Sequence, residues 1–148
     1  MKKIAKYRAY FFEGLSFADF DTYAEKAMPG CNGLRFDLSC EDYEKAGGFS
    51  KSDIARAIIE SAAFILAENL SDMETRGFLA EKIRIIGGIT NSPVCVRIIS
   101  ETLGRDILVV NGVSAGAVGS AMLAGIGVGD FENEKACFDA MKFQEIKY

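Results

Sequence analysis

Residues 83–110 read IRIIGGITNSPVCVRIISETLGRDILVV, and this stretch indicates the fold class. The apolar run 82–86 predicts a strand, and the pair Gly87-Gly88 after it predicts a turn. Residues 106–110 predict a second strand, with a helix between the two strands. A strand, a crossover helix and a second strand form a right-handed parallel unit, so the predicted class is α/β.

The helix inside this stretch has clear boundaries. Ser92 is a good N-cap residue, and Pro93 suits the first helical position because its missing N–H would have no intrahelical partner there. The helix is predicted to run through Leu103, and Gly104 provides its C-terminal stop.

The N-terminal half of the chain predicts two more helices with the same kind of start. Ser16 and Ser50 are N-caps, and each has an aspartate three residues on, Asp19 and Asp53, that can complete a capping box. The predicted buried stripe of the second helix, the longest in the chain, consists of Ile54, Ala57, Ile58, Ser61, Ala62, Ile65 and Leu66. Between the two helices, residues 34–38 alternate apolar and polar and predict a strand.

The C-terminal part predicts a helix from Ser114 to about Val128 and an amphipathic helix over residues 133–143. Gly116 and Gly119 cost this first helix about 1 kcal/mol each relative to Ala. They therefore predict a face that a neighbouring helix, the sheet or a flat ligand approaches closely, with helix–sheet packing favoured.

The uncharged run 107–129 is long enough to span a bilayer. Inside it, however, Asn111-Gly112 is a strong turn signal, and no cluster of Lys or Arg flanks the run. A buried strand, a turn and a buried helix fit better, so we expect no membrane partner.

The composition excludes several function classes. With 148 residues, 49% of them hydrophobic, the chain suits one domain with an ordinary core. It contains no histidine, which excludes a Ser-His-Asp triad, a Cys-His pair and imidazole metal ligands. The net charge of −4 argues against nucleic-acid binding, which needs Lys and Arg against phosphates.

The cysteines and the N-terminus indicate the compartment. Cys31, Cys40, Cys95 and Cys137 lie far apart, without a Cys-x-x-Cys motif, which predicts free thiols, three of them buried. This pattern favours a reducing cytoplasm. The apolar run that ends before Glu13 is too short for a signal peptide, so we expect a solvated, basic start to the chain.

The turn before the central helix is the candidate site. Gly87 and Gly88 lack Cβ atoms, so a ligand can lie against the backbone, and the helix N-terminus favours an anion such as phosphate. Thr90, Asn91 and Ser92 add short donors and acceptors. The turn is neither a Walker A loop nor a dinucleotide fingerprint. On its own residues, an ordinary strand-to-helix turn with a Ser cap fits equally well.

Four motifs in sequence order extend this interpretation. SFADFDTYAEKAMPGCNGLRF (16–36) and IARAIIESAAFIL (54–66) precede the run 83–110, and SAGAVGSAMLAGIGVG (114–129) follows it. Together they resemble the C-terminal domain of the FGGY carbohydrate kinases. In that family an acidic-aromatic helix leads into Pro-Gly-x-x-Gly-Leu, and a long central helix, a Gly-Gly turn and an Ala/Gly-rich helix follow. The resemblance covers roughly residues 15–131.

The resemblance implies the second lobe of the actin-like (ribonuclease H-like) ATPase fold, truncated at its N-terminal side. We expect a single domain over residues 1–148, with a basic N-terminal segment (1–14), a family-like core (15–131) and a C-terminal helix (132–148).

The resemblance also implies ATP and Mg²⁺ as ligands. Gly87 and Gly88 match the glycines that lie against the nucleotide phosphates and ribose. Thr90, Asn91 and Ser92 match positions around the nucleoside, with Asn91 where an adenine-facing side chain is often found.

The implied function is the ATP-binding C-terminal domain of a sugar kinase that transfers the γ-phosphoryl group to a carbohydrate hydroxyl. The family's first lobe and its Thr/Ser-Gly phosphate loop have no counterpart here, so we expect no activity without the missing sugar-binding lobe and assign no catalytic residue. Asp37, Glu41 and Asp42 lie near the region that would face the cleft, but a solvated acidic loop is the favoured interpretation.

The alternative is a non-catalytic kinase remnant that acts as a nucleotide-binding or self-association module. The expected partner besides ATP is therefore either the missing N-terminal lobe or a second copy of the chain.

Overall fold

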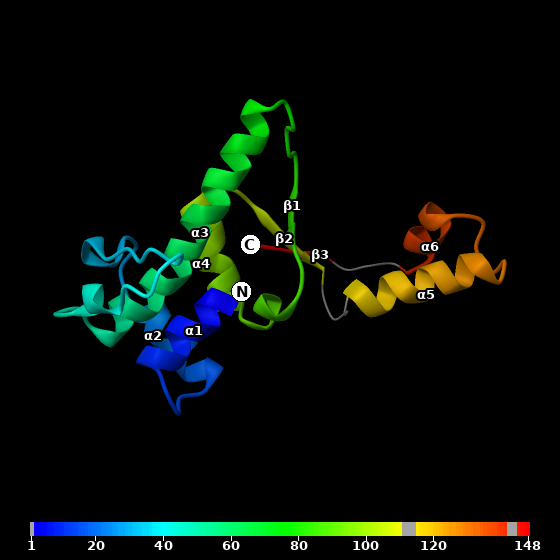
Figure 1. Cartoon of the computed structure of the whole chain (residues 1–148). Helices are drawn as coiled ribbons and strands as arrows, with labels where there is room; N and C mark the ends of the chain where they lie inside the picture. The colour runs from blue at the N-terminus through cyan, green and yellow to red at the C-terminus, as the bar shows by residue number, and fades with distance from the viewer. Residues whose placement is uncertain (1, 111–114, 142–144) are drawn as a thin grey trace. The chain divides into compact units, whose positions relative to one another are not determined.

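The computed structural model describes residues 2–110, 115–141 and 145–148. In it the chain forms two compact units (Figure 1). The first unit contains residues 1–81 and 92–105, and the second contains residues 82–91 and 106–148. The single domain expected over residues 1–148 stays a prediction.

Helices make up the first unit, and the second combines a small sheet with helices. The elements of the first unit are α1 (Lys2–Phe11), α2 (Phe17–Lys26), α3 (Lys51–Thr75), α4 (Pro93–Leu103) and the 3-10 helices η1 (Cys31–Gly33) and η2 (Tyr43–Ala46). The elements of the second unit are β1 (Ile83–Ile85), η3 (Gly88–Asn91), β2 (Ile107–Val110), α5 (Ala115–Gly127), α6 (Glu134–Met141) and β3 (Glu145–Lys147).

Both capping boxes predicted from the sequence are confirmed. The hydroxyls of Ser16 and Ser50 accept the backbone N–H groups of Asp19 and Asp53, at 3.1 Å in each case. Each aspartate in turn accepts the N–H of its N-cap residue. Hydrogen bonds from Ser16 hold the pKa of the Asp19 carboxyl below its ordinary value. Such a cap stabilises a helix by about 1 kcal/mol.

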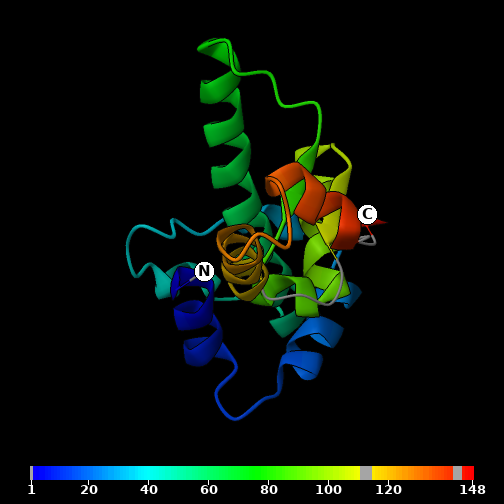
Figure 2. The same cartoon turned by 90° about the vertical axis from the view of Figure 1, so that its right-hand side faces the viewer.

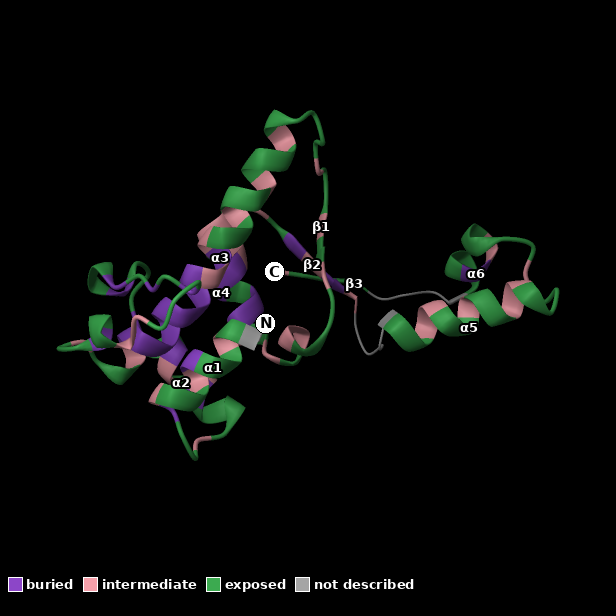
Figure 3. Cartoon of the chain, in the orientation of Figure 1, coloured by how far each residue is buried: buried purple, intermediate pink, exposed green. Residues whose placement is uncertain are grey.

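The N-terminal half of α3 forms the core of the first unit (Figure 3). The residues from Asp53 to Ser61 are all buried, because α1, α2 and α4 pack around this half of the helix. The C-terminal half projects beyond the other helices of the unit (Figure 2), and Ile65 and Leu66 are 40% and 41% exposed. The predicted buried stripe is therefore right in its first half and wrong at these two residues.

Helix α1 corrects the expectation of a solvated N-terminus. Tyr7 and Phe12 are 2% and 1% exposed, and the Tyr7 hydroxyl contacts the carbonyls of Asp37 (3.0 Å) and Cys40 (2.6 Å) and the Asp42 carboxylate. Burial, together with the bond to Asp42, raises the pKa of Tyr7 above its ordinary value. Tyr7 and Phe11 are four residues apart and lie on one face of α1, whereas Tyr10 is 61% exposed.

Residues 34–38 show the predicted alternation but do not form a strand. Leu34, Phe36 and Leu38 are buried, and the residues between them are exposed. The Phe36 N–H donates to the Ser61 hydroxyl of α3 at 2.9 Å, so the segment lies along a helix. The alternating burial shows that one side of the segment is in contact with the protein. A helix can provide that contact as well as a sheet can.

The predicted parallel strand pair is confirmed in the second unit. Strands β1 and β2 pair in parallel, with Ile83 opposite Ile107 and Ile85 opposite Val109. In the chain, α4 lies between them, capped by Ser92 and ended by Gly104 in the left-handed conformation. The α/β class is therefore right.

Strand β3 was not expected from the sequence. It pairs antiparallel with β2, with Val109 opposite Ile146, and gives the sheet order β1-β2-β3. Backbone bonds of 2.9 and 3.1 Å between Ile107 and Tyr148 extend this pairing. A three-residue strand at the end of a chain has too little pattern to be predicted.

Helices α5 and α6 pack against each other in the second unit. A Cβ at Gly125 would lie 2.8 Å from the Phe131 ring, whereas one at Gly116 or Gly119 would meet no described atom within 4 Å. The glycine that close packing requires is therefore Gly125. The predicted turn at Asn111-Gly112, the predicted helix start at Ser114 and the end of the predicted 133–143 helix fall outside the described residues.

Among the helices in the described ranges, none is both long and apolar enough to cross a bilayer.

The cysteines are all free thiols, as predicted, and three are buried. Cys31, Cys95 and Cys137 have less than 9% of their surface exposed, and Cys40 is exposed in the acidic loop. The pKa of the Cys40 thiol is raised, first by partial desolvation and then by the charges of Asp37 and Asp42.

We expect Phe12→Ala to lower the free energy of unfolding by about 3–5 kcal/mol, the cost of deleting a large buried ring. Glu13→Ala, at the exposed neighbouring position, is the matched control and should change stability by less than about 0.5 kcal/mol. Urea denaturation followed by circular dichroism measures both. Equal stability of the two variants would contradict the burial of Phe12, the residue directly after α1.

We expect a thiol reagent to label Cys40 alone in the folded protein and the other three cysteines only after denaturation. Because the pKa of Cys40 is raised, little thiolate is present near neutral pH, so labelling should be slower than for free cysteine and accelerate as the pH rises. Absorbance with Ellman's reagent measures this, and Cys40→Ser should abolish the folded-state reaction. Rapid labelling of that variant would contradict the burial of the other thiols.

Candidate functional site

The predicted turn follows β1 directly. After β1 ends at Ile85, Gly87 adopts a φ of +94°, in the left-handed region that favours glycine. A Cβ placed on Gly87 would meet no described atom within 4 Å, and both Gly87 and Gly88 are exposed. The backbone at this point is therefore open to close approach by a ligand.

The polar side chains of Thr90 and Asn91, which follow the glycines, have different roles. Thr90 donates both its N–H and its hydroxyl to the Gly87 carbonyl, at 3.0 and 2.8 Å. Asn91, the last residue of η3, is exposed. Thr90 therefore holds the shape of the turn, and Asn91 is available for contact with a ligand.

Ser92 belongs to the first unit, because the chain passes between the units after Asn91. Its hydroxyl accepts the Cys95 N–H at 3.0 Å, which makes it the N-cap of α4. Pro93 has no N–H, so at most the N–H groups of Ser92 and Val94 remain for an anion. The helix N-terminus thus offers its dipole and two donors at most, fewer than a helix without this cap.

The three acidic residues named from the sequence have local partners. Asp37 accepts the Ser39 N–H and hydroxyl at 2.8 and 2.6 Å, and Glu41 pairs with Lys6. Asp42 is not solvated: its side chain is 14% exposed and binds Lys45 at 2.9 Å. Desolvation opposes ionisation of Asp42, but hydrogen bonds from Tyr7, the Asp37 N–H and Lys45 still lower its pKa. These carboxylates hold the acidic loop in place.

Two surface pockets lie beside this loop in the first unit. One, of about 330 Å³, is lined by Arg35, Phe36, Asp37, Leu38, Lys45, Ser61, Ile65 and Glu68. The other, of about 380 Å³, is lined by Tyr10, Glu41, Asp42, Tyr43, Glu44 and Lys45. Their charged walls are paired with each other, for example Arg35 with Glu68 at 3.0 Å, so they offer few unsatisfied groups to a ligand.

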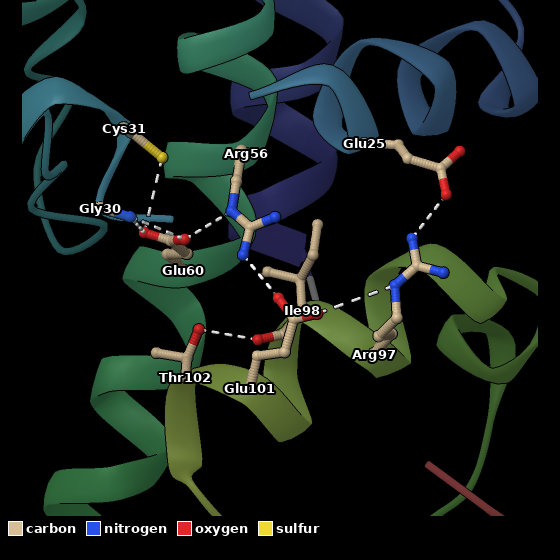
Figure 4. Close-up of polar contacts among 9 residues, drawn as sticks. All are labelled: Glu25, Gly30, Cys31, Arg56, Glu60, Arg97, Ile98, Glu101 and Thr102. Carbon is tan, nitrogen blue, oxygen red and sulfur yellow. Dashed lines mark hydrogen bonds and ion pairs between the residues drawn. The ribbon is translucent and has the colours of Figure 1, made fainter. Parts of the chain in front are cut away.

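A polar cluster that the sequence analysis did not single out lies inside the first unit (Figure 4). Arg56 of α3 donates from Nε to Glu60 and from a terminal nitrogen to Glu101 of α4, both at 2.6 Å. The Arg56 and Glu60 side chains are 7% and 6% exposed, and that of Glu101 is 46% exposed. We call these three residues the Arg56 cluster. An Arg and a Glu four residues apart inside an apolar helix were the sequence signal for it.

The Arg56 cluster also holds the turn at η1. Both carboxylate oxygens of Glu60 accept the Gly30 N–H, at 3.2 and 3.1 Å, and one lies 3.5 Å from the Cys31 sulfur. Residues 30–33 all have positive φ, including the non-glycine residues Cys31 (49°) and Asn32 (53°). Such backbone is disfavoured for L-residues, so the bonds from Glu60 compensate for local strain.

Burial sets the protonation states in this region. Desolvation disfavours the charge on Arg56, but the bonds to Glu60 and Glu101 outweigh it and raise the pKa of the guanidinium. Burial first, and the nearby Glu60 second, raise the pKa of the Cys31 thiol to about 12. Arg56 is therefore charged and Cys31 is a neutral thiol at neutral pH. Among the described residues, no group of three or more His, Cys, Asp or Glu side chains could hold a metal ion.

Comparison with known proteins matches most of the chain to one family. The model of the C-terminal domain of the FGGY family of carbohydrate kinases matches residues 10–128. A xylulose kinase of Staphylococcus epidermidis is 28% identical over 151 residues, covering 92% of this chain and 30% of that protein. A glycerol kinase of Streptococcus pyogenes is 26% identical over 130 residues, covering 86% and 25%. The chain thus spans at most 30% of the length of these two relatives.

Solved structures show the same fold. Xylulose kinase from Lactobacillus acidophilus, with bound ligand, gives a TM-score of 0.75 at 17% identity, covering 99% of this chain and 33% of that one. Xylulose kinase from Rhodospirillum rubrum gives 0.72 at 20% identity, covering 92% and 30%. Plasmodium falciparum glycerol kinase with ADP gives 0.67 at 16% identity, covering 97% and 31%. The predicted fold, the second lobe of the actin-like ATPases, is confirmed.

Proposed function

The chain belongs to the FGGY family of carbohydrate kinases, as part of its C-terminal domain, and on that premise we propose that it binds ATP as the nucleotide-binding part of a sugar kinase. The observation that carries this proposal is the open turn at Gly87, which joins the end of a parallel strand to the N-terminus of α4. Such a turn suits the close approach of a phosphate group. The similar glycerol kinase with ADP supports a nucleotide as the ligand.

Each residue of the turn has a role in this proposal. Gly87 and Gly88 lie against the phosphates and ribose, where a side chain would block approach. Asn91 is exposed and faces the adenine, and Ser92 lies near the nucleoside while it caps α4. Thr90 acts through the turn, because both of its donors bind the Gly87 carbonyl.

Mg²⁺ enters this proposal with the nucleotide. Mg²⁺ in such sites is bound by substrate phosphates, waters and one or two carboxylates, so it needs no cluster of protein ligands. The described residues, which hold no such cluster, fit a metal that arrives as Mg-ATP. Bound there, the ion would neutralise charge on the transferring phosphoryl group.

Binding of the sugar acceptor requires a second lobe besides this chain. The relatives are about three times as long as this chain, and the acidic side chains of the described loop are occupied by local bonds. We propose that the γ-phosphoryl group passes to a sugar hydroxyl only when a sugar-binding lobe supplies the acceptor and a base. Phosphoryl transfer depends on positioning, which one lobe cannot provide for both substrates.

We expect Gly87→Ala to weaken Mg-ATP binding at least tenfold, that is by about 1.4 kcal/mol or more. The new methyl group would occupy the open face of the turn. Gly77→Ala is the matched control, because Gly77 also has a φ near +90° and open space around its Cβ position. It introduces the same backbone strain away from the turn and should leave affinity unchanged. Isothermal titration calorimetry measures the Mg-ATP affinity of both variants. Equal affinities of the two variants would contradict a role of the turn in nucleotide binding.

We expect the chain alone to produce no ADP from ATP with xylulose or glycerol, because the sugar-binding lobe is not supplied. A coupled assay of ADP release measures this. Robust turnover would overturn the proposed need for a second lobe.

If calorimetry shows no saturable heat of ATP binding and the molar mass by light scattering doubles with concentration, the alternative self-association module replaces the kinase proposal.

A further inference from the structure

We propose that Arg56, through its bond to Glu101, is a positioning residue that fixes α4 on α3 and thereby places the N–H groups of Ser92 and Val94 for an anion such as a nucleotide phosphate. The link to the nucleotide rests on the proposed function, whereas the placing of α4 does not. Both helices and these N–H groups lie in the first unit.

The contact between α3 and α4 is mainly apolar. On α4 the fully buried residues are Val96, Ile98 and Ile99, and on α3 they include Ile58 and Ile59. These side chains are all branched aliphatic groups of similar size. Hydrophobic contact is non-directional, so these side chains hold the two helices together without a directional bond.

The Arg56 cluster supplies the missing direction. The planar guanidinium has donors in fixed positions, one bound to Glu60 of its own helix and another to Glu101 of α4, both at 2.6 Å. A shift of α4 would break the bond to Glu101 and leave the charge of a 7% exposed side chain with one partner fewer. Buried polar groups are known to set register in this way.

Arg56 is also held from its other side. Glu60 accepts the Gly30 N–H with both oxygens, so the guanidinium cannot follow a displaced Glu101 without disturbing the turn at η1.

Other ion pairs also involve α4 or a residue just after it. Arg97 pairs with Glu25, at 47% and 56% exposure, and lies 3.9 Å from Glu101 of its own helix. Arg105, just after α4, pairs with Glu74 of α3 at 2.6 Å, at 34% and 39% exposure. Exposed pairs hold little energy, so Arg56, at 7% exposure, is the most buried of these attachments.

A change in the position of Glu101 is transmitted along α4 to its N-terminus. Glu101 lies nine residues after Ser92 on the same helix, about 13 Å along its axis at 1.5 Å per residue. A hydrogen-bonded helix moves as a rigid body over this length, so an axial shift at Glu101 appears at the N–H groups of Ser92 and Val94. Those are the donors that the Ser92 cap leaves for an anion.

Glu101→Ala tests the proposal, because Glu101 is 46% exposed and its removal leaves the Arg56–Glu60 pair and the fold intact. In the nucleotide-free protein, we expect the amide resonances of Val94 and Cys95 to move in ¹⁵N–¹H spectra. We also expect Mg-ATP affinity to fall about three- to tenfold by calorimetry. Glu25→Ala is the control: it removes the exposed pair of α4 and should change neither measurement.

Glu101→Gln separates positioning from simple stability. Its amide oxygen still accepts from Arg56, so it should restore the Val94 and Cys95 resonances and most of the affinity. Unmoved resonances in Glu101→Ala, or equal movement in Glu25→Ala, would overturn the proposal. If the unmodified chain gives no ATP heat, the proposed function fails, and the amide resonances alone decide whether Arg56 places α4.

Discussion

The buried guanidinium of Arg56 is the constraint on which the first unit depends. It lies in the half of α3 that three other helices surround, where an unpaired charge costs about 3–5 kcal/mol. The charge is therefore paired with two carboxylates, that of Glu60 on the next turn of α3 and that of Glu101 on α4. Through Glu60 the same charge holds the left-handed turn at residues 30–33. One buried side chain thus binds α4 directly and, through Glu60, the turn at η1.

The predicted turn has an open backbone in the second unit, and the start of α4, in the first unit, is already partly satisfied. Gly87 removes the side chain where a phosphate would approach, and Thr90 closes the turn by binding the Gly87 carbonyl twice. Ser92 and Pro93 use or remove two of the first donors of α4. Few backbone donors therefore remain at the start of α4.

Local chemistry made much of this structure predictable. The capping boxes at Ser16 and Ser50, the Pro93 start and the Gly104 end of α4 all follow from residues within a few positions of each other. The parallel strand pair follows from the order strand, helix, strand. The prediction failed where a distant segment decides the outcome. Residues 34–38 alternate like a strand but lie along α3, and α1 is held by contacts of Tyr7 with residues 30 or more positions away.

By itself, the sequence determined the starts of α2, α3 and α4, the α/β class, the family and the position of the glycine turn, because each depends on short-range patterns or on motifs in a fixed order. Only the tertiary structure decided which charges are buried together. Arg56 and Glu60 lie one helical turn apart, but Glu101 is 45 residues further along than Arg56, and no local pattern connects them. The partner of a buried charge depends on how the helices pack, and the packing is established only when the chain folds.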